Sequence, residues 1–465
     1  MDRWDHACSI NHRNPETTLM SKRIVILGSG ESGVGSAILA QAKGFDVFVS
    51  DMGMIKDKYK RVLEEKNIAF EEGKHTEEKV LNANEIIKSP GIPDKAELIK
   101  KAKAKGIKII SEIEFAGRYT NAKKICITGS NGKTTTTLLT FHILEKAGYN
   151  VGLAGNIGKS FAWQVATENF DYYVLELSSF QLDGMYDFKA DIAILLNITP
   201  DHLDRYEYKF ENYALSKFRI VQNQAPDNAF IYCMDDPAIM EYLEKVNPKA
   251  THYPFSIKKK LEEQGAYLTE NQIIININQN PLTMTLEELS LQGKHNVYNS
   301  MASAIAARLV DVRKENVRES LSDFVNIEHR LEDVATINGI EFVNDSKATN
   351  VNSVWYALES MTKPVVLIMG GVDKGNDYTQ LHDLVKDKVK AMVCLGVDNS
   401  KLLESFSSVV ETIAEAKTMT EAVSYAYKMG KKGDVVLLSP ACASFDLFQN
   451  YEDRGSQFKA AVRSL

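Results

Sequence analysis

A short glycine-rich segment with one lysine is the clearest chemical feature of the chain. The segment ITGSNGKTT runs from Ile127 to Thr135, between an apolar run and a stretch typical of a helix. Backbone N–H groups at such a helix start hold phosphate oxygens. In that setting Lys133 can neutralise nucleotide phosphates, and the Thr134 hydroxyl can bind Mg²⁺. A simple turn with a solvated lysine is the alternative, but it does not explain four consecutive threonines, which are poor helix formers.

A second glycine-rich loop lies near the start of the chain. GSGESGVG matches G-x-G-x-x-G, and Asp51 ends the following predicted strand. The pattern is typical of dinucleotide-binding folds, although the same geometry can hold any diphosphate, including that of a UDP-sugar. A nicotinamide-dependent oxidoreductase resting on Gly28, Gly30, Gly33 and Asp51 is therefore an alternative function, and a tight packing turn is a structural alternative. The nucleotide loop downstream disfavours NAD.

Polar side chains stand at the ends of two apolar runs in the middle of the chain. Glu176 lies near the end of DYYVLELSS, and Asp201 and His202 follow the next run, ADIAILLNIT. A lone buried carboxylate is costly unless it is paired or bound to metal. We expect these runs to be adjacent parallel strands whose carboxyl ends meet at the ligand edge of a sheet. Thr134, Glu176 and His202 could then share a Mg²⁺ ion.

Three loops in the last third of the chain each follow an apolar strand-like run. They are NDSKATN, MGGVDKGNDY and SPACASFDLFQNYEDRG, which carry Asp345, Lys347, Thr349, Lys374, Ser439, Ser444 and Tyr451. One such loop alone is typical of an ordinary surface loop. Three of them at the same edge of a sheet predict that this edge binds a ligand. By contrast Lys217, in the helical stretch ENYALSKFRIV, is on composition alone a surface lysine.

The elements that must position these residues predict three α/β domains. Residues 22–51 alternate strand, glycine loop, helix and strand, which is a βαβ unit. Near-continuous apolar runs are typical of parallel strands covered on both faces. We predict domains at 20–112, 113–326 and 327–465, each built on a mostly parallel sheet, after a disordered leader at 1–19. An alternating run, QIIININ, predicts a small antiparallel addition, and NVYNSMASAIAARLV predicts a helix.

Composition excludes several classes of function. The chain has 465 residues, 44% hydrophobic and 25% charged, with a formal net charge of −7. An acidic balance argues against a nucleic-acid partner. Five cysteines without a C-x-x-C pair favour reduced thiols and a cytoplasmic location. No apolar run approaches the roughly 18 residues of a membrane span, and the leader lacks the apolar core of a secretory signal.

The motifs together resemble the Mur ligase family over about residues 20–465. The most specific are TGSNGKTT, ELSSFQL, NITPDHLDRY, GKHNVYN, EHRLE, NDSKATN and SPACASFD. The usual G-x-x-x-x-G-K-[ST] loop needs a glycine where Ile127 stands, whereas this family's shortened loop, T-G-x-N-G-K-[ST], is matched. The resemblance implies a UDP-binding first domain with a dinucleotide-like fold, a central ATPase-like domain and an amino-acid-binding third domain with a dinucleotide-like fold.

The implied reaction is the ATP-dependent addition of an amino acid to a UDP-N-acetylmuramoyl substrate through an acyl phosphate, a step of peptidoglycan precursor synthesis. NDSKATN with SPACASFD is most similar to members that add D-glutamate to UDP-N-acetylmuramoyl-L-alanine. Sister ligases for L-alanine, a diamino acid or D-alanyl-D-alanine, and folate-polyglutamate ligases, remain alternatives, although the D-N-P-R-like motif of diamino-acid ligases is absent. A non-catalytic nucleotide-gated regulator is a further alternative, disfavoured because Glu176, His202 and Lys217 are all present.

The resemblance also implies roles for individual residues. Lys133, Glu176, His202 and Lys217 are the implied catalytic set, and Thr134, Glu176, His202 and a carbamylated Lys217 are the implied ligands of two Mg²⁺ ions. The implied ATP contacts are Gly129, Ser130, Asn131, Gly132, Lys133, Thr134, Thr135, Asn296, Asn299, Arg330 and Asp345. The implied UDP-substrate contacts are Gly30, Ser32, Gly33, Asp51, Ser89 and Asn156, and the implied D-glutamate contacts are Lys347, Thr349, Lys374, Ser444 and Tyr451.

The chain departs from the family pattern at two places. The first loop is richer in glycine than in many relatives, which leaves the uracil contacts open beyond Asp51. Tyr451 stands where phenylalanine is common, and its hydroxyl can add a contact. We expect a monomer whose partners are its small-molecule substrates.

Overall fold

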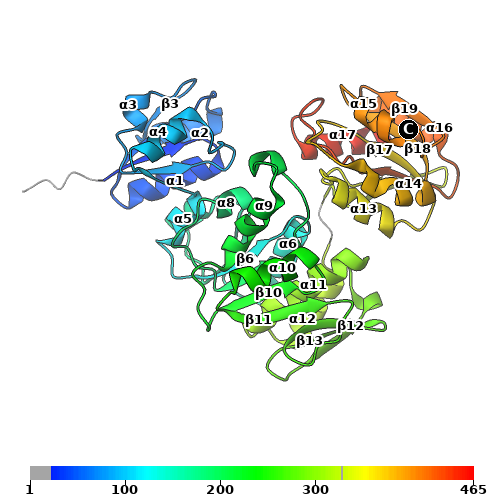
Figure 1. Ribbon diagram of the computed structural model, residues 1–465, viewed down its shortest axis with the longest axis horizontal. Coiled ribbons are helices and arrows are strands. Elements are labelled where there is room, and N and C mark those ends of the chain that lie inside the picture. The colour runs from blue at the N-terminus through cyan, green and yellow to red at the C-terminus, as the bar shows by residue number, and fades with distance from the viewer. Residues whose placement is uncertain (1–21, 326–327) are drawn as a thin grey trace, which may run out of the picture. The chain divides into compact units, whose positions relative to one another are not determined.

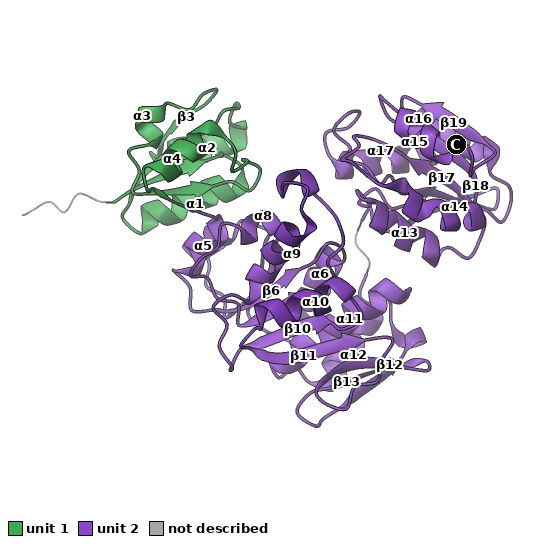
Figure 2. Ribbon diagram, in the orientation of Figure 1, with its two compact units in different colours: residues 1–109 green, residues 110–465 purple. Residues whose placement is uncertain are grey.

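The computed structural model describes residues 22–325 and 328–465, so the predicted leader lies outside the described residues. The chain divides into two compact units, residues 1–109 and 110–465 (Figure 2). The described residues contain three separate sheets, of five, nine and six strands. The α/β fold class with three mostly parallel sheets is thereby confirmed, while the exact domain boundaries stay predictions.

The first sheet has the order β3-β2-β1-β4-β5, with β1 parallel to β2 and β4. It lies in the blue part of the ribbon (Figure 1). The bounds are β1 Arg23–Leu27, α1 Glu31–Ala42, β2 Asp46–Ser50, α2 Asp57–Glu65, β3 Ala69–Glu71, α3 Glu77–Val80, β4 Glu85–Lys88, α4 Glu97–Ala104 and β5 Lys108–Ile110. The predicted strand–loop–helix–strand start is confirmed. Its loop lies at the carboxyl end of β1, next to the end of β2.

The second sheet has the order β14-β13-β12-β11-β10-β9-β6-β8-β7. Its strands are β6 Lys123–Thr128, β7 Val151–Gly155, β8 Tyr172–Glu176, β9 Ile192–Leu195, β10 Ala229–Cys233, β11 Thr251–Ser256, β12 Gly265–Thr269, β13 Gln272–Asn276 and β14 Leu282–Thr285. The predicted antiparallel addition is confirmed, because β13 pairs antiparallel with β12 and β14.

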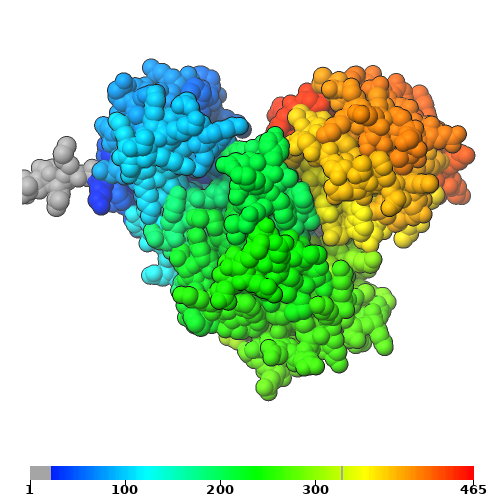
Figure 3. Space-filling model, in the orientation of Figure 1, coloured from blue at the N-terminus to red at the C-terminus, as the bar shows by residue number. Residues whose placement is uncertain are grey.

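Helices pack along the second sheet, and the predicted Ala-rich helix is confirmed as α11. The helices are α5 Glu112–Gly117, α6 Lys133–Lys146, α7 Phe161–Thr167, α8 Ser179–Leu182, α9 Phe210–Phe218, α10 Pro237–Val246, α11 Lys294–Leu309 and α12 Lys314–Asp323, with short 3-10 turns at η1 Leu203–Arg205, η2 Arg219–Val221 and η3 Leu286–Glu288. In the space-filling view, the residues of this sheet and its helices, coloured from cyan to yellow-green, form one continuous body (Figure 3).

One expectation about this sheet is wrong. The strands that carry Glu176 and precede His202 are not adjacent, because β8 and β9 lie on opposite sides of β6. Neighbours in the chain need not be neighbours in a sheet when each connection is a crossover. As a result, the segments after β8 and β9 flank the glycine-rich loop that follows β6.

The third sheet has the order β15-β16-β20-β17-β18-β19. The bounds are β15 Glu332–Ile337, β16 Ile340–Asn344, α13 Val351–Ser360, β17 Val365–Met369, η4 Tyr378–Leu381, α14 His382–Lys388, β18 Val389–Leu395, α15 Ser400–Phe406, β19 Ile413–Ala416, α16 Met419–Met429, β20 Val435–Leu438 and α17 Tyr451–Arg463. The edge strand β15, antiparallel to β16, was not predicted, because its polar, half-buried sequence lacks the apolar run used to find strands.

Alternation along one strand explains why the central strands of this sheet are almost wholly apolar. Val365, Leu367 and Met369 of β17 belong to one core cluster, and Val366 and Ile368 belong to another. Successive side chains of a strand point to opposite faces. Both faces of the sheet are therefore buried, as the apolar runs predicted.

Two further expectations concern membrane-spanning segments and the state of the cysteines. Among residues 22–325 and 328–465, no helix is both long and apolar enough to cross a membrane. The four cysteines of these ranges, Cys126, Cys233, Cys394 and Cys442, are buried free thiols. Cys8 lies outside the described residues.

Candidate active site

The nucleotide loop lies between β6 and α6, as predicted. Gly129 and Gly132 both have positive φ angles, of 156° and 81°. A Cβ atom at Gly132 would lie 2.5 Å from the Asn299 side-chain oxygen. The buried Thr136 hydroxyl donates to that same oxygen at 3.1 Å. The threonines therefore fill the contact between α6 and α11, which explains why poor helix formers stand there.

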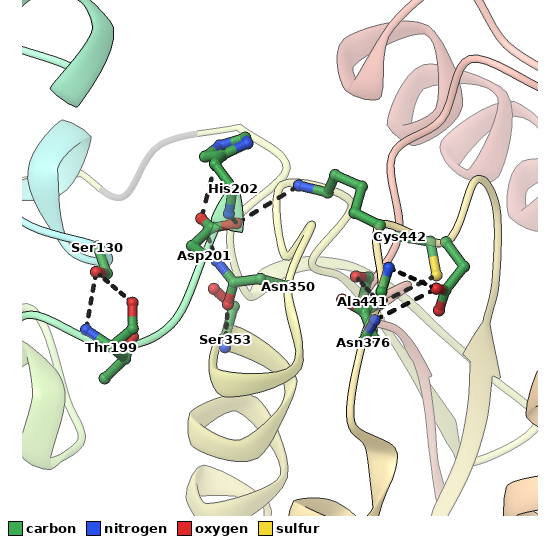
Figure 4. Close-up of polar contacts among 12 residues, drawn as sticks. Ser130, Thr199, Asp201, His202, Asn350, Ser353, Asn376, Ala441 and Cys442 are labelled. Atoms are coloured by element: carbon green, nitrogen blue, oxygen red, sulfur yellow. Dashed lines mark hydrogen bonds and ion pairs between the residues drawn. The ribbon is translucent and has the colours of Figure 1, made fainter. Parts of the chain in front are cut away.

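The loop is anchored to the segment that follows β9. The Ser130 hydroxyl accepts from the Thr199 backbone N–H and donates to the Thr199 carbonyl, both at 2.9 Å (Figure 4). The backbone N–H of Asn131 donates to Asn197 Oδ1 at 2.8 Å. Ser130 and Asn131 thus hold the loop in shape. The unbonded N–H groups at the start of α6 are the donors suited to phosphate oxygens.

Two lysines converge on one carbonyl oxygen of this loop. Lys133 Nζ donates to the carbonyls of Gly129 at 2.8 Å and Ser130 at 2.9 Å. Lys217 Nζ also donates to the Gly129 carbonyl at 2.8 Å and lies 4.7 Å from the centre of the Tyr213 ring. Lys217 is only 1% exposed. The composition-based expectation of a surface lysine is therefore wrong, because α9 packs its face with Lys217 into the core of the site.

Burial and mutual repulsion both act on these two cations. Burial lowers the pKa of Lys133, while the carboxylates of Glu176 and Asp201 oppose that change. Burial, followed by repulsion from Lys133, lowers the pKa of Lys217 well below its usual range. Both effects favour the uncharged form of an amine. Lys217 therefore holds its proton less strongly than an ordinary surface lysine.

A buried carboxylate with a vacant oxygen lies beside the loop. Glu176, at the end of β8, is 1% exposed, and its Oε1 accepts from Asn156 Nδ2 at 2.7 Å. Within the described ranges, Glu176 Oε2 and the Thr135 hydroxyl have no hydrogen-bond partner. Carboxylate and hydroxyl oxygens are the ligands that Mg²⁺ prefers. The vacant Glu176 oxygen therefore fits a ligand of a magnesium ion held with nucleotide phosphates.

The same described residues contain no cluster of three or more His, Cys, Asp or Glu side chains placed to hold a metal by themselves. The predicted ligand set contains two residues of these four types, Glu176 and His202, and it stays a prediction. A site of this kind needs further oxygen ligands from phosphate, water or a modified lysine.

Asp201 links the predicted metal ligand His202 to a C-terminal lysine. Its Oδ2 lies 3.7 Å from His202 Nε2 (Figure 4). Its Oδ1 lies 3.7 Å from Lys374 Nζ. Burial opposes ionisation of Asp201, but His202 and Lys374 outweigh it and lower the pKa of the carboxyl. Burial lowers the pKa of His202, against the pull of Asp201. Asp201 is therefore the common partner of His202 and Lys374.

A cavity adjoins the nucleotide loop on the side of α11. The two predicted asparagines lie on this helix, where Asn299 Nδ2 donates to Asn296 Oδ1 at 3.1 Å. Asn299 lines the cavity, as do Arg330 and Asp345. Several lining residues were not predicted: Lys258, His295, Tyr298 and Tyr356. His295 and Tyr298 stand within the quoted motif GKHNVYN, so their spacing to the two asparagines was a usable signal.

The predicted C-terminal residues follow the ends of β16, β17 and β20. Asp345 accepts from the Ser439 hydroxyl at 2.9 Å, and burial raises the pKa of Asp345 to about 6. Lys347 Nζ lies 5.3 Å from the centre of the Tyr451 ring, and burial lowers the pKa of Lys347 to about 8. Ser444 is buried after β20. Thr349 is half-buried, two residues beyond Lys347.

A buried arginine that was not predicted ties these loops together. Arg454 of α17 is 1% exposed and donates to the carbonyls of Ser346 at 2.9 Å and Cys442 at 3.1 Å. It also contacts the Gly370 carbonyl at 3.4 Å. These carbonyls belong to the segments after β16, β20 and β17. The quoted motif NYEDRG contained this residue, but nothing in its spacing predicts burial.

The three glycines of the predicted G-x-G-x-x-G pattern, Gly28, Gly30 and Gly33, have different structural roles. Gly30 is the N-cap of α1, and a Cβ atom there would meet nothing within 4 Å. A Cβ atom at Gly28 would lie 2.3 Å from the Ser89 hydroxyl, and one at Gly33 would lie 2.0 Å from the Gly28 carbonyl. Gly28 and Gly33 therefore serve packing. Gly30 leaves open space at the start of the helix, where a phosphate can approach.

Asp51, the other predicted residue of this loop, closes it. Its Oδ2 accepts from the backbone N–H and hydroxyl of Ser29, both at 2.6 Å, and its Oδ1 accepts from the Gly53 N–H at 2.8 Å. The carbonyl of Ser32 accepts from the Ser36 hydroxyl inside α1. These predicted residues thus shape one loop, and their ligand contacts stay predictions.

Comparison with known families covers all three sheets. Residues 23–98 match the MurD N-terminal domain, residues 127–307 the Mur ligase middle domain, and residues 329–442 the Mur ligase glutamate ligase domain. The chain is 60% identical to the UDP-N-acetylmuramoylalanine--D-glutamate ligase of Bacteroides fragilis, across 96% of this chain and 100% of the relative. It is 58% identical to the ligase of that name from Porphyromonas gingivalis, across 95% and 98%.

Solved structures of low sequence identity share the fold. A pseudomurein peptide ligase type C from Methanothermus fervidus has a TM-score of 0.61 at 20% identity, covering 96% of this chain and 100% of that one. The UDP-N-acetylmuramate-alanine ligase of Thermotoga maritima has a TM-score of 0.60 at 18% identity, covering 95% and 99%. With relatives 60% identical over nearly its whole length, the chain belongs to the Mur ligase family.

Proposed function

We propose that the chain is an ATP-dependent ligase that adds D-glutamate to UDP-N-acetylmuramoyl-L-alanine, a step of peptidoglycan precursor synthesis. The relatives that share about 60% of its residues over their full length carry the name of this activity. One structural observation supports the chemistry most directly. The nucleotide loop follows β6, which lies between β8, the strand that carries Glu176, and β9, the strand that precedes Asp201, and Lys133 Nζ donates to two carbonyls of this loop.

The chemistry follows from the weakness of a carboxylate as an acyl donor. The substrate carboxylate attacks the γ-phosphorus of ATP, the bond to ADP breaks, and an acyl phosphate forms. The amine of D-glutamate then attacks the acyl carbon, and the tetrahedral intermediate expels phosphate to leave an amide. Phosphoryl transfer needs positioning and charge neutralisation rather than a protein nucleophile. Lys133 is the residue that supplies positive charge to the transferred phosphoryl group.

Magnesium would be held by Glu176 and Thr134, with His202 contributing and two ions in total. The vacant Glu176 oxygen supports this assignment. When bound, Mg²⁺ supplies charge neutralisation at the β- and γ-phosphates. Lys217 would complete the site as a carbamate, because its lowered pKa favours the neutral amine that adds CO₂. A carbamate turns a cationic side chain into an oxygen ligand.

The remaining predicted contacts complete the proposal. The adenine and ribose would lie in the cavity beside Asn299, Arg330 and Asp345, with Asn296 orienting Asn299. The UDP group would bind the first glycine loop through Gly30, Ser32, Gly33, Asp51 and Ser89, and Asn156 would contact the muramoyl group. D-Glutamate would bind Lys347, Thr349, Lys374, Ser444 and Tyr451. We further propose a cytoplasmic monomer, since ATP and a sugar nucleotide are its substrates.

The decisive experiment measures phosphate release from Mg-ATP and UDP-N-acetylmuramoyl-L-alanine with D-glutamate, L-glutamate, L-lysine or diaminopimelate. We expect release only with D-glutamate, together with a product heavier by one glutamyl residue in mass spectrometry. Release with another amino acid would keep the chemistry but assign the chain to a sister ligase. Release with none, combined with NADH binding to the first unit, would contradict the proposal.

A further inference from the structure

One side chain at the start of α13 contacts two loops of the second sheet at once. Asn350 is the N-cap of this helix, and its Oδ1 accepts from the Ser353 N–H at 2.8 Å. Its Nδ2 lies 3.2 Å from Asn131 Oδ1 in the nucleotide loop. The same Nδ2 lies 3.4 Å from Asp201 Oδ2 (Figure 4). The acceptor end of one amide therefore starts the helix, while its donor end reaches both loops.

A second group of α13 converges on the same acceptor. The hydroxyl of Ser353, 8% exposed, donates to Asn131 Oδ1 at 2.7 Å. Asn131 Oδ1 thus faces two donors from one helix turn, which fills both lone pairs of an amide oxygen. The backbone of Asn131 is fixed independently, because its N–H and carbonyl both bond the Asn197 side chain. The contact therefore joins one rigid loop to another rigid element.

The position of Asn350 in the sequence gives this contact a consequence for the reaction. Asn350 directly follows Thr349 and lies three residues after Lys347, both of them proposed D-glutamate contacts. Lys374, a third proposed contact, lies 3.7 Å from Asp201 on its other carboxylate oxygen. The segment that would hold the incoming amine is thereby tied to the loop that would hold the γ-phosphate. Misplacement of reacting groups by about 1 Å can cost about 10²-fold in rate.

We propose that Asn350, with Ser353, is a positioning residue that sets the D-glutamate segment against the nucleotide loop through Asn131 and Asp201. This inference rests on the proposed function. It assigns to a helix cap a role in turnover as well as in stability. Asn350 touches no reacting atom in this assignment and acts through the placement of Lys347 and Thr349.

Substitutions that keep the cap separate the two roles. Serine caps helices about as well as asparagine, so Asn350→Ser keeps the bond to the Ser353 N–H and removes only the donors to Asn131 and Asp201. We expect kcat to fall roughly five- to tenfold and the KM for D-glutamate to rise, because a net hydrogen bond is lost. The KM for the UDP-substrate and the melting temperature should stay unchanged.

Asn350→Asp should have a larger effect. Aspartate also caps well, but its carboxylate would face Asp201 in place of a donor, and like charges repel. We expect a loss of kcat greater than that of Asn350→Ser, reduced by added salt because screening weakens the repulsion. Ser353→Ala, which removes only the second donor to Asn131, should give a smaller loss of a few fold.

The matched control is Thr418→Ala. Thr418 is the N-cap of α16, where its hydroxyl accepts from the Glu421 N–H at 3.2 Å. This variant removes the N-cap of a helix beside the third sheet, away from the nucleotide loop. The melting temperature should therefore fall, while kcat and KM stay unchanged. Unchanged kinetics for Asn350→Ser, or a loss that only follows its melting temperature, would overturn the inference. If Asn350→Ser fails to fold, unchanged kinetics of Ser353→Ala would overturn it. Absence of D-glutamate addition by the unmodified enzyme would instead contradict the proposed function.

Discussion

The two glycine-rich loops of the chain have the same local form and different surroundings. Each follows a parallel strand and begins a helix, at Gly30 before α1 and at Gly132 before α6. The first is closed by one carboxylate, Asp51, and keeps open space at Gly30. The second has two lysines on one carbonyl, of which Lys133 is half-buried and Lys217 is buried. In both loops, a strand–glycine–helix turn thus supplies N–H groups for phosphate. The neighbouring elements determine whether catalytic side chains lie close to that loop.

The position of each loop in its sheet explains this difference. The segments that follow β8 and β9 flank the second loop and bring Glu176 and Asp201 near Lys133. The first loop has β2 and β4 as neighbours, which contribute Asp51 and Ser89. We therefore expect loss of a residue in the second loop to remove turnover, and loss of one in the first loop to weaken substrate binding.

The largest expected effect comes from Lys133→Ala. Removal of the cation that faces the transferred phosphoryl group should lower kcat by at least about 10³-fold. Binding of the UDP-substrate, measured by calorimetry, should be unchanged because the first glycine loop is intact. Loss of turnover and of UDP-substrate binding together would show that the two loops do not have separate roles.

Lys217→Ala should lower kcat by about 10²-fold, because an oriented metal ligand is lost. Added short carboxylic acids should restore part of the activity by entering the space left by the side chain. The measurement is a titration of turnover against acetate concentration, with Lys133→Ala as the control that acetate does not restore. Full activity of Lys217→Ala without acetate would refute the carbamate assignment.

A pair of alanine substitutions compares the loops directly. Gly132→Ala should destabilise the protein by about 1–2 kcal/mol or more, because Gly132 has φ of 81° and its Cβ atom would lie 2.5 Å from Asn299 Oδ1. Gly30→Ala meets no atom within 4 Å in the protein, so unfolding should be unaffected. It should raise the KM for the UDP-substrate roughly fivefold to tenfold, because this glycine lets a pyrophosphate approach.

Thermal unfolding and substrate kinetics of the two glycine variants check this prediction together. Equal loss of stability in both variants would show that Gly30 is constrained by packing like Gly132. An unchanged KM for the UDP-substrate in Gly30→Ala would remove the first loop from the phosphate site.

The smallest effect is a dependence on pH. The pKa of Lys347 is lowered to about 8 by burial, whereas a free lysine keeps its charge to about pH 10. The positive charge is therefore present below pH 8 and lost above it. If Lys347 binds an anion, kcat/KM for D-glutamate should fall above pH 8, by at most about tenfold per pH unit.

Lys347→Arg is the control for this profile, since arginine keeps its charge throughout this range. Its kcat/KM should show no decline near pH 8, whatever its absolute value. A decline of the same size in both proteins would assign the titration to another group, such as the substrate amine.

Local patterns in the sequence were sufficient to predict the two glycine-rich loops, most of the strands and the family. GSGESGVG and TGSNGKTT each specify a turn and the helix after it, since glycine spacing and backbone N–H groups act within a few residues. Apolar runs predicted the buried parallel strands because alternation on a doubly covered strand leaves no polar positions. The polar edge strand β15 lacked that signal and was missed.

Contacts between distant parts of the chain were decided only by the tertiary structure. The order β9-β6-β8 places Glu176 and His202 on two sides of the nucleotide loop. The strands that precede these two residues, β8 and β9, are nevertheless consecutive in the sequence. The 1% exposure of Lys217 and Arg454 depends on the helices that pack over them. The contact of Asn350 with Asn131 joins residues 219 positions apart. Sequence periodicity indicates which residues are neighbours along the same helix or strand. The burial of a side chain, its pKa and its hydrogen-bond partners depend on which other elements pack against it.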